Sequence, residues 1–149
     1  MKLEFSGSPE ITAGKERVWA RLMDPHFLAR SAPGVESVEV IDPTHFQVVS
    51  GFGAGSFKVR FTMDVELFDI VTERSARMRM QAQAPGSAVD VLSSIEIQEA
   101  GPNTVRLNWS AVSEITGTVA GLGARLMEGA ARRLTEQFWA DFARRVTSE

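Results

Sequence analysis

The sequence predicts an α+β fold, in which a curved antiparallel sheet of six to seven strands wraps around one long C-terminal helix. Three observations support this class. Residues 35–115 largely alternate between apolar and polar side chains, which is the period of half-buried strands. No helical pattern interrupts that region, so the strands are expected to form a meander rather than alternating βα units. Residues 118–145 instead repeat apolar side chains at helical spacing.

The N-terminal part of the chain is expected to contain one strand and two short helices. Leu3 to Ile11 predicts the strand, and Lys15 to Met23 predicts the first helix. Asp24 is a good N-cap and proline suits the first helical position, so Pro25 to Arg30 predicts the second helix. Pro33-Gly34 ends that helix.

The strands of the meander follow from the change to a period of two, which is clearest in Phe57–Leu67. Turn residues such as Asp42-Pro43-Thr44 and Pro85-Gly86 separate them. The expected strands are Val35–Ile41, His45–Ser50, Phe57–Leu67, Arg74–Ala84, Val89–Ile97 and Val105–Ile115.

The long helix is expected from Thr118 to about Arg145. Its glycines, Gly121, Gly123 and Gly129, would each cost about 1 kcal/mol relative to alanine in a helix interior. They indicate either a close approach to the sheet or a flexible wall that leaves space for a ligand. The apolar face consists of Leu122, Leu126, Ala130, Leu134 and Phe138.

Composition narrows the function classes. The chain has 149 residues, which suits a single domain over residues 1–149. A net charge of -3 gives no electrostatic case for nucleic-acid binding. The absence of cysteine excludes disulfides, thiolate metal sites and cysteine nucleophiles. With no signal peptide or membrane span, the expected location is cytoplasmic, with at most peripheral membrane contact.

No catalytic motif, metal site or cofactor site is predicted. His26 and His45 have no local acidic partner at metal-ligand spacing. Asp64 and Glu66 alternate with apolar residues and are expected to face solvent. No serine lies in a G-x-S-x-G elbow.

The glycine-rich segment Gly51 to Gly55 is interpreted as a hairpin connection with Phe52 at its tip. A strand follows it rather than a helix, so a phosphate-binding loop is disfavoured. The glycines serve either a wide turn or a mobile lip over a cavity. In the second interpretation, the gate consists of Gly51, Phe52, Gly53, Gly55, Gly121 and Gly123.

A large, soft set of side chains is expected to face the helix. Methionine adapts its shape and is common in promiscuous pockets, and a single helix often fails to fill a curved sheet. The alternative is an ordinary core. The candidate ligand-binding residues are Phe57, Phe61, Met63, Met78, Met80, Val91, Trp109, Leu122, Leu126 and Phe138.

A second apolar patch, formed by Trp139, Phe142 and Val146, lies away from this face of the helix. It is expected either to pack on the N-terminal strand and short helices or to contact a partner or a second copy in a homodimer.

These features together resemble the START-like (SRPBCC) helix-grip superfamily, and within it the family of the carbon monoxide dehydrogenase G subunit. The resemblance covers nearly the whole chain. The segments that carry it are Val18-Trp19 to Asp24-Pro25, Leu28-Ala29-Arg30, Ala32 to Val38, Phe57 to Phe61, and Gly117 to Phe142.

The resemblance implies a hydrophobic cavity and an accessory, non-enzymatic role beside a molybdenum hydroxylase of the carbon monoxide dehydrogenase type. The protein would carry a quinone- or lipid-like molecule, or recruit the enzyme to the membrane. Many relatives have cysteines where this chain has Ser31 and Val35, and a tail beyond Glu149, which favours carriage over anchoring. The alternative is a polyketide cyclase- or aromatase-like enzyme, for which Ser93, Ser113 and Asp141 are the inward candidates.

Overall fold

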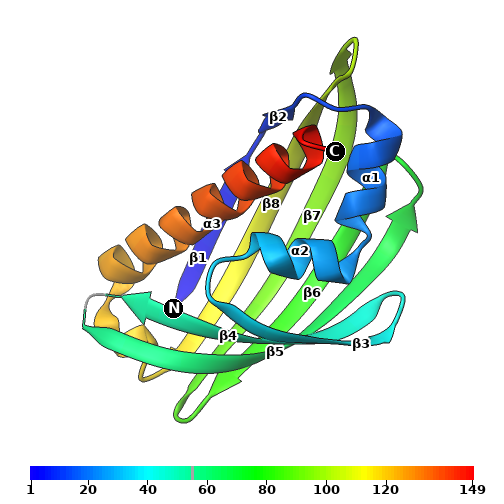
Figure 1. The fold of residues 1–149 in the computed structure, drawn as a ribbon. Coiled ribbons are helices and arrows are strands. Elements are labelled where there is room, and N and C mark those ends of the chain that lie inside the picture. Colours follow the sequence, from blue (N-terminus) through cyan, green and yellow to red (C-terminus); the bar gives the residue numbers. More distant parts are fainter. Residues whose placement is uncertain (55) are drawn as a thin grey trace.

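The strands form a single antiparallel sheet, and the long helix α3 (Ala124–Thr147) lies across its concave face (Figure 1). The structure is a computed structural model that describes residues 1–54 and 56–149, without the side chains of Ala54 and Phe57. The strands are β1 (Lys2–Gly7), β2 (Glu10–Ile11), β3 (Val35–Asp42), β4 (His45–Ala54), β5 (Phe57–Val71), β6 (Ser75–Ala84), β7 (Ser87–Gly101) and β8 (Thr104–Gly117). Their order is β1-β8-β7-β6-β5-β4-β3, with β2 also paired to β8, which confirms the predicted meander.

Alternation along the strands separates an apolar face under the helices from a charged outer face. In β5, Phe61, Val65 and Leu67 are buried, whereas Arg60 and Thr62 are exposed. Successive side chains of a strand point to opposite faces, so this pattern fixes the register of the sheet.

The first strand is divided in two, whereas the sequence predicted one strand. β1 and β2 both pair with β8, in antiparallel register. Pro9 lies between them and has no N–H to donate, although its carbonyl accepts a hydrogen bond from the Leu107 N–H at 2.9 Å. The proline therefore interrupts the edge of the sheet without detaching the chain from β8.

The two short helices form as predicted, as α1 (Lys15–Leu22) and α2 (Pro25–Ser31). Asp24 caps α2, because its carboxylate accepts hydrogen bonds from the backbone N–H groups of His26 at 3.0 Å and Phe27 at 3.3 Å. Both helices pack against the C-terminal half of α3. Their shared core contains Ile11, Ala13, Val18, Trp19, Leu22, Phe27, Phe142 and Val146.

The C-terminal patch is part of this core and is not a docking surface. Phe142 and Val146 are both fully buried. The ring of Phe142 makes an edge contact with that of Phe27 in α2, with centroids 5.4 Å apart. Of the two predicted roles for these residues, packing on the N-terminal elements is the correct one.

The long helix begins later than predicted. Thr118 does not start it; a single 3-10 turn, η1 (Ala120–Leu122), precedes α3. Gly123 has a φ of 94°, a conformation that glycine adopts without steric cost, and it separates the two helices. Gly121 and Gly123 therefore precede the long helix, and only Gly129 lies inside it.

The glycine-containing segment around Gly51 belongs to a strand. Gly51, Phe52 and Gly53 pair with successive residues of β5, so the predicted loop with Phe52 at its tip is wrong for these positions. Glycine retains both backbone hydrogen-bonding groups, and pairing with a long neighbouring strand outweighs its weak strand propensity. Gly55 lies outside the described residues.

Three clusters of buried side chains surround the space between the sheet and the helices. One joins α1 and α2 to α3, the second joins the sheet to the start of α3, and the third joins α2 to β4 and β5. Among the described residues, no helix combines the length and apolar character needed to cross a membrane.

Candidate functional site

A cavity of about 480 Å³ lies between the concave face of the sheet and helices α2 and α3. Ligand pockets in proteins typically measure roughly 300–1,000 Å³, so this space can hold a small organic molecule. Strands β4 to β8 form its floor and walls, and one face of α3 covers it.

Most of the residues predicted to line this space do line it. They come from four strands and from α3, and all of them are apolar or aromatic. These residues are Phe61, Met63, Met78, Met80, Trp109 and Phe138.

Three predicted lining residues lie elsewhere. Val91 is half-buried on β7 but does not reach the cavity, and Leu122 packs in the cluster at the start of α3. Leu126 is 37% exposed, whereas its neighbour Met127 is 4% exposed and lines the cavity. The side chain of Phe57 lies outside the described residues.

An aromatic wall closes one side of the cavity. Trp109 of β8 stacks on Trp139 of α3, with ring centroids 6.1 Å apart and planes at 29°. Phe138 meets Trp139 edge-on at 4.9 Å. Trp139 was not predicted as a lining residue, although it lies four residues beyond Thr135, which also lines the cavity.

The Trp109 ring depends on a glycine of the neighbouring strand. A Cβ at Gly7 would lie 2.8 Å from Trp109 Nε1, so only glycine lets β1 approach the ring this closely. The Nε1–H group is buried without a hydrogen-bond partner among the described residues.

Another edge of the cavity is formed where β4 meets the turn after α2. Gly51 and Phe52 line the cavity there, and the Gly51 N–H donates to the Gly34 carbonyl at 2.9 Å. Phe52 packs edge-on against Phe61, with centroids 6.1 Å apart. Of the other residues predicted as a gate, Gly53 is exposed in β4, and Gly121 and Gly123 do not line the cavity.

Polar groups are few among the described lining residues: Ser50, Ser93, Ser94, Ser113, Thr135 and Arg77. The Arg77 guanidinium lies over the Phe68 ring, 5.1 Å from its centroid, and pairs with Asp69 at 3.4 Å. Its side chain is 42% exposed, so its charge belongs to the outer face. No carboxylate or imidazole is among the described lining residues.

The enzyme alternative loses its acidic candidate. Ser93 and Ser113 line the cavity, but Asp141 does not. Asp141 instead pairs with Arg144 and Arg145 on the same helix. A general acid or base must reach the substrate, so Asp141 cannot serve the cavity in this arrangement.

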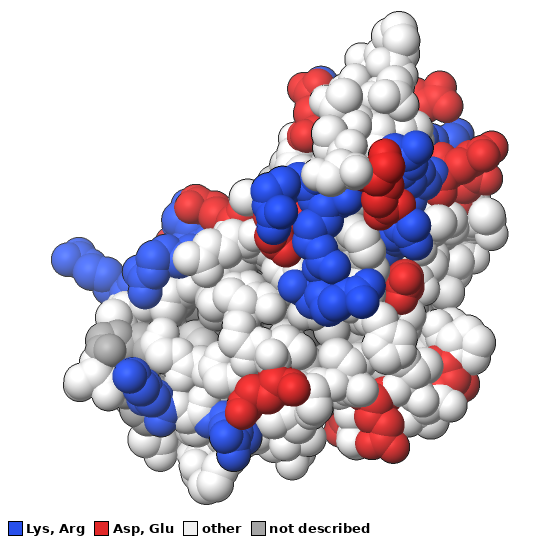
Figure 2. All heavy atoms as spheres, viewed as in Figure 1, with Lys and Arg blue, Asp and Glu red and all other residues white. Residues whose placement is uncertain are grey.

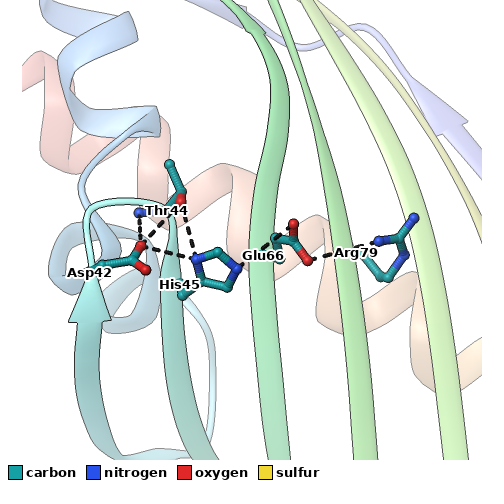
Figure 3. Close-up of polar contacts among 5 residues, drawn as sticks. All are labelled: Asp42, Thr44, His45, Glu66 and Arg79. Atoms are coloured by element: carbon teal, nitrogen blue, oxygen red, sulfur yellow. Dashed lines mark hydrogen bonds and ion pairs between the residues drawn. The ribbon is translucent and has the colours of Figure 1, made fainter.

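His45 belongs to a charged network on the outer face of the sheet (Figure 3). Its Nδ1 lies 3.0 Å from Asp42, and its Nε2 lies 3.7 Å from Glu66, which in turn lies 3.8 Å from Arg79. The hydrogen bond to Asp42 raises the pKa of His45 above its ordinary value of 6.5. The Thr44 N–H, followed by His45, lowers the pKa of Asp42.

This network is a surface feature. Its members do not line the cavity, and the described residues contain no group of three or more acidic or histidine side chains placed to hold a metal ion. The partners of His45 were not predicted, because Glu66 reaches it from the neighbouring strand.

Charged side chains are unevenly distributed around the cavity. Figure 2 shows Lys and Arg side chains gathered where α1, α2 and the end of α3 meet, beside a largely uncharged surface. In this region Arg145 lies over the Phe27 ring at 4.7 Å, and Arg21 pairs with Glu149. The Arg21 guanidinium holds the pKa of the Glu149 carboxyl below its usual range.

A comparison with protein-family models supports the predicted resemblance. The model that describes the G subunit of carbon monoxide dehydrogenase (CoxG) matches residues 7–147. No curated protein matches the sequence of this chain.

Solved structures share the fold at low sequence identity. A conserved protein from Geobacillus kaustophilus is 23% identical with a TM-score of 0.91, over 98% of this chain and 96% of that one. A START superfamily protein from Mycobacterium smegmatis is 12% identical with a TM-score of 0.74, over 97% of each chain. The Zhui aromatase/cyclase from Streptomyces sp. R1128 is 12% identical with a TM-score of 0.73, over 98% and 94%. These similarities establish the START-like fold alone.

Proposed function

We propose, from the premise that the chain belongs to the CoxG family of carbon monoxide dehydrogenase, that it is a non-enzymatic protein that binds an apolar small molecule. The observation that carries the proposal is the apolar cavity of about 480 Å³ under α3.

The lining favours an apolar ligand for two reasons. An uncharged cavity of this size offers water few hydrogen bonds, whereas an apolar molecule gains both burial and dispersion contacts. Met63, Met78, Met80 and Met127 line it together, and their flexible thioethers can adapt to ligands of different shape. A quinone- or lipid-like molecule fits this chemistry.

Family membership suggests the partner. We infer that the protein serves a molybdenum hydroxylase of the carbon monoxide dehydrogenase type, as the carrier of an apolar redox partner or lipid. The cavity gives less support to a cyclase-type enzyme, because its described polar lining groups are mainly hydroxyls, with no acid or base beside them.

The test compares two substitutions of the same kind on α3. Ala131 lines the cavity, and Ala131→Phe fills part of it; Ala140 is exposed, so Ala140→Phe is the matched control. Wild type and control are expected to retain co-purifying or added apolar molecules in native mass spectrometry, and Ala131→Phe is expected to lose them.

Two results would count against carriage. One is a folded Ala131→Phe variant that binds as well as the control. The other is a wild-type protein that retains no apolar molecule from cell extract and binds no neutral hydrophobic dye.

A further inference from the structure

Two serine hydroxyls lie on the cavity floor among apolar side chains. Ser93 of β7 and Ser113 of β8 both line the cavity. In the register of these strands, Ser93 faces Ala111 and Val91 faces Ser113. The two serines are therefore diagonal neighbours on one face of the sheet, a pairing that places side chains within reach of a shared group.

Neither hydroxyl is hydrogen-bonded to any residue that the structure describes. The hydroxyl that faces the cavity from α3 differs, because Thr135 Oγ1 donates to the Ala131 carbonyl at 2.8 Å within that helix. The hydroxyl of Ser87, at the start of β7, likewise accepts from the Val119 N–H at 3.0 Å. A polar group shielded from water loses free energy unless it finds a partner, so Ser93 and Ser113 are available to a ligand.

The serine pair lies beside the aromatic wall. Trp109, Ala111 and Ser113 are successive inward residues of β8, and Trp109 stacks on Trp139. Ala111 is small and leaves space above the sheet between the serines. A flat ring lying on the tryptophans would thus have its edge near both hydroxyls.

We propose that Ser93 and Ser113 form a hydrogen-bonding subsite for a neutral acceptor oxygen, of the carbonyl type, on a flat ring held by Trp109 and Trp139. This inference rests on the proposed function and adds the ligand's polar chemistry to it. The aliphatic part of the ligand lies along the methionines of β5 and β6.

The absence of charge in the lining selects a neutral ligand group over an anion. A carboxylate moved into an apolar cavity needs a cation beside it. The guanidinium of Arg77 is directed to Phe68 and Asp69 on the outer face. Hydroxyl donors are sufficient for a carbonyl oxygen, which carries no net charge.

The experiment uses fluorenone and fluorene, two probes that differ only in a carbonyl group in place of a methylene. Each is titrated against protein loaded with the neutral dye Nile red. Wild type is expected to bind fluorenone more tightly than fluorene. The Ser93→Ala/Ser113→Ala double variant is expected to lose about tenfold in fluorenone affinity, from two neutral hydrogen bonds, and nothing in fluorene affinity. Ser110→Ala, at an exposed serine of β8, is the matched control.

A second measurement does not depend on the variants folding. The carbonyl stretch of fluorenone bound to wild type is expected at a lower infrared frequency than in alkane, because hydrogen bonding weakens the C=O bond. An alkane-like frequency, or equal loss of both probes in the double variant, overturns the subsite and leaves the carrier function intact. Failure of wild type to bind dye and both probes overturns the proposed function as well.

Discussion

Gly117 shows how the path of the chain constrains single residues. It ends β8 with a φ of 86°, and a Cβ there would overlap the carbonyl oxygen of Gly86. That carbonyl also accepts the Thr118 N–H at 2.8 Å, which holds the start of the connection to η1. No periodicity in the sequence distinguishes this glycine from Gly121, which has open space around it.

We expect Gly117→Ala to destabilise the protein by more than about 2 kcal/mol, from left-handed strain of about 1–2 kcal/mol and the overlap with Gly86. Gly121→Ala is the control and is expected to stay within about 0.5 kcal/mol of wild type. Urea unfolding measures both. Equal midpoints for the two variants would contradict the geometry at Gly117.

His45 provides a prediction about pH. Because Asp42 raises its pKa, the contribution of protonated His45 to stability is fully present below about pH 6.5 and is lost as the pH rises through the higher folded-state pKa. In an NMR titration, the His45 ring is expected to titrate above 6.5. Asp42→Asn is expected to lower that pKa.

The control for this titration is Asp64→Asn, because Asp64 lies on the same outer face but accepts its hydrogen bond from Gln47 at 2.7 Å. It is expected to leave the His45 titration close to wild type. An unchanged midpoint in Asp42→Asn would show that the carboxylate does not govern this imidazole.

At the scale of elements, existence and order were predictable, whereas boundaries depended on tertiary pairing. The alternation of β5 and the Asp24-Pro25 start of α2 are local patterns, and the structure contains both. The strand character of Gly51 to Gly53 comes from pairing with β5, which a local glycine count does not report.

Helix α3 shows the same limit for the candidate site. Positions 126 and 127 differ by only one 100° step, so the periodicity placed Leu126 in the buried stripe, and packing on the sheet selected Met127. Trp139 was missed for a related reason. Its side chain lies on the border between the cavity face and the core face, and only contact with Trp109 assigns it.

The C-terminal half of α3 should contribute more stability than its N-terminal turn. Phe142→Ala removes a fully buried ring that contacts Phe27 and Phe138, and is expected to cost about 3–5 kcal/mol. Leu126→Ala, at an exposed position outside the buried core of α1 and α2, is expected to cost less than about 1 kcal/mol. Thermal unfolding of the two variants tests this order, and a reversed order would refute it.

At the scale of the molecule, the sheet and helices form a shell with separate tasks. The junction of α1, α2 and the end of α3 is packed with buried side chains, whereas the middle of α3 covers the cavity. Ligand binding is therefore expected to add stability to a fold that is already complete.

A bound ligand should stabilise the whole domain. At a free concentration one hundred times Kd, the gain is expected to be about 2.7 kcal/mol, seen as a higher Tm. Ala140→Phe should show the same increase, and Ala131→Phe should show none. A Tm that ligand leaves unchanged in wild type would contradict binding to the folded state.

The pairing of β1 with β8 also affects how the chain folds during synthesis. Leu3 pairs with Ser113, and the core around α1 and α2 is completed by Phe142 and Val146. The first strand and both short helices therefore leave the ribosome long before their partners exist. Contacts this distant in sequence make folding slow and keep apolar surface exposed in the meantime. The nascent N-terminal third is thus a segment for chaperones to bind until the last helix has been made.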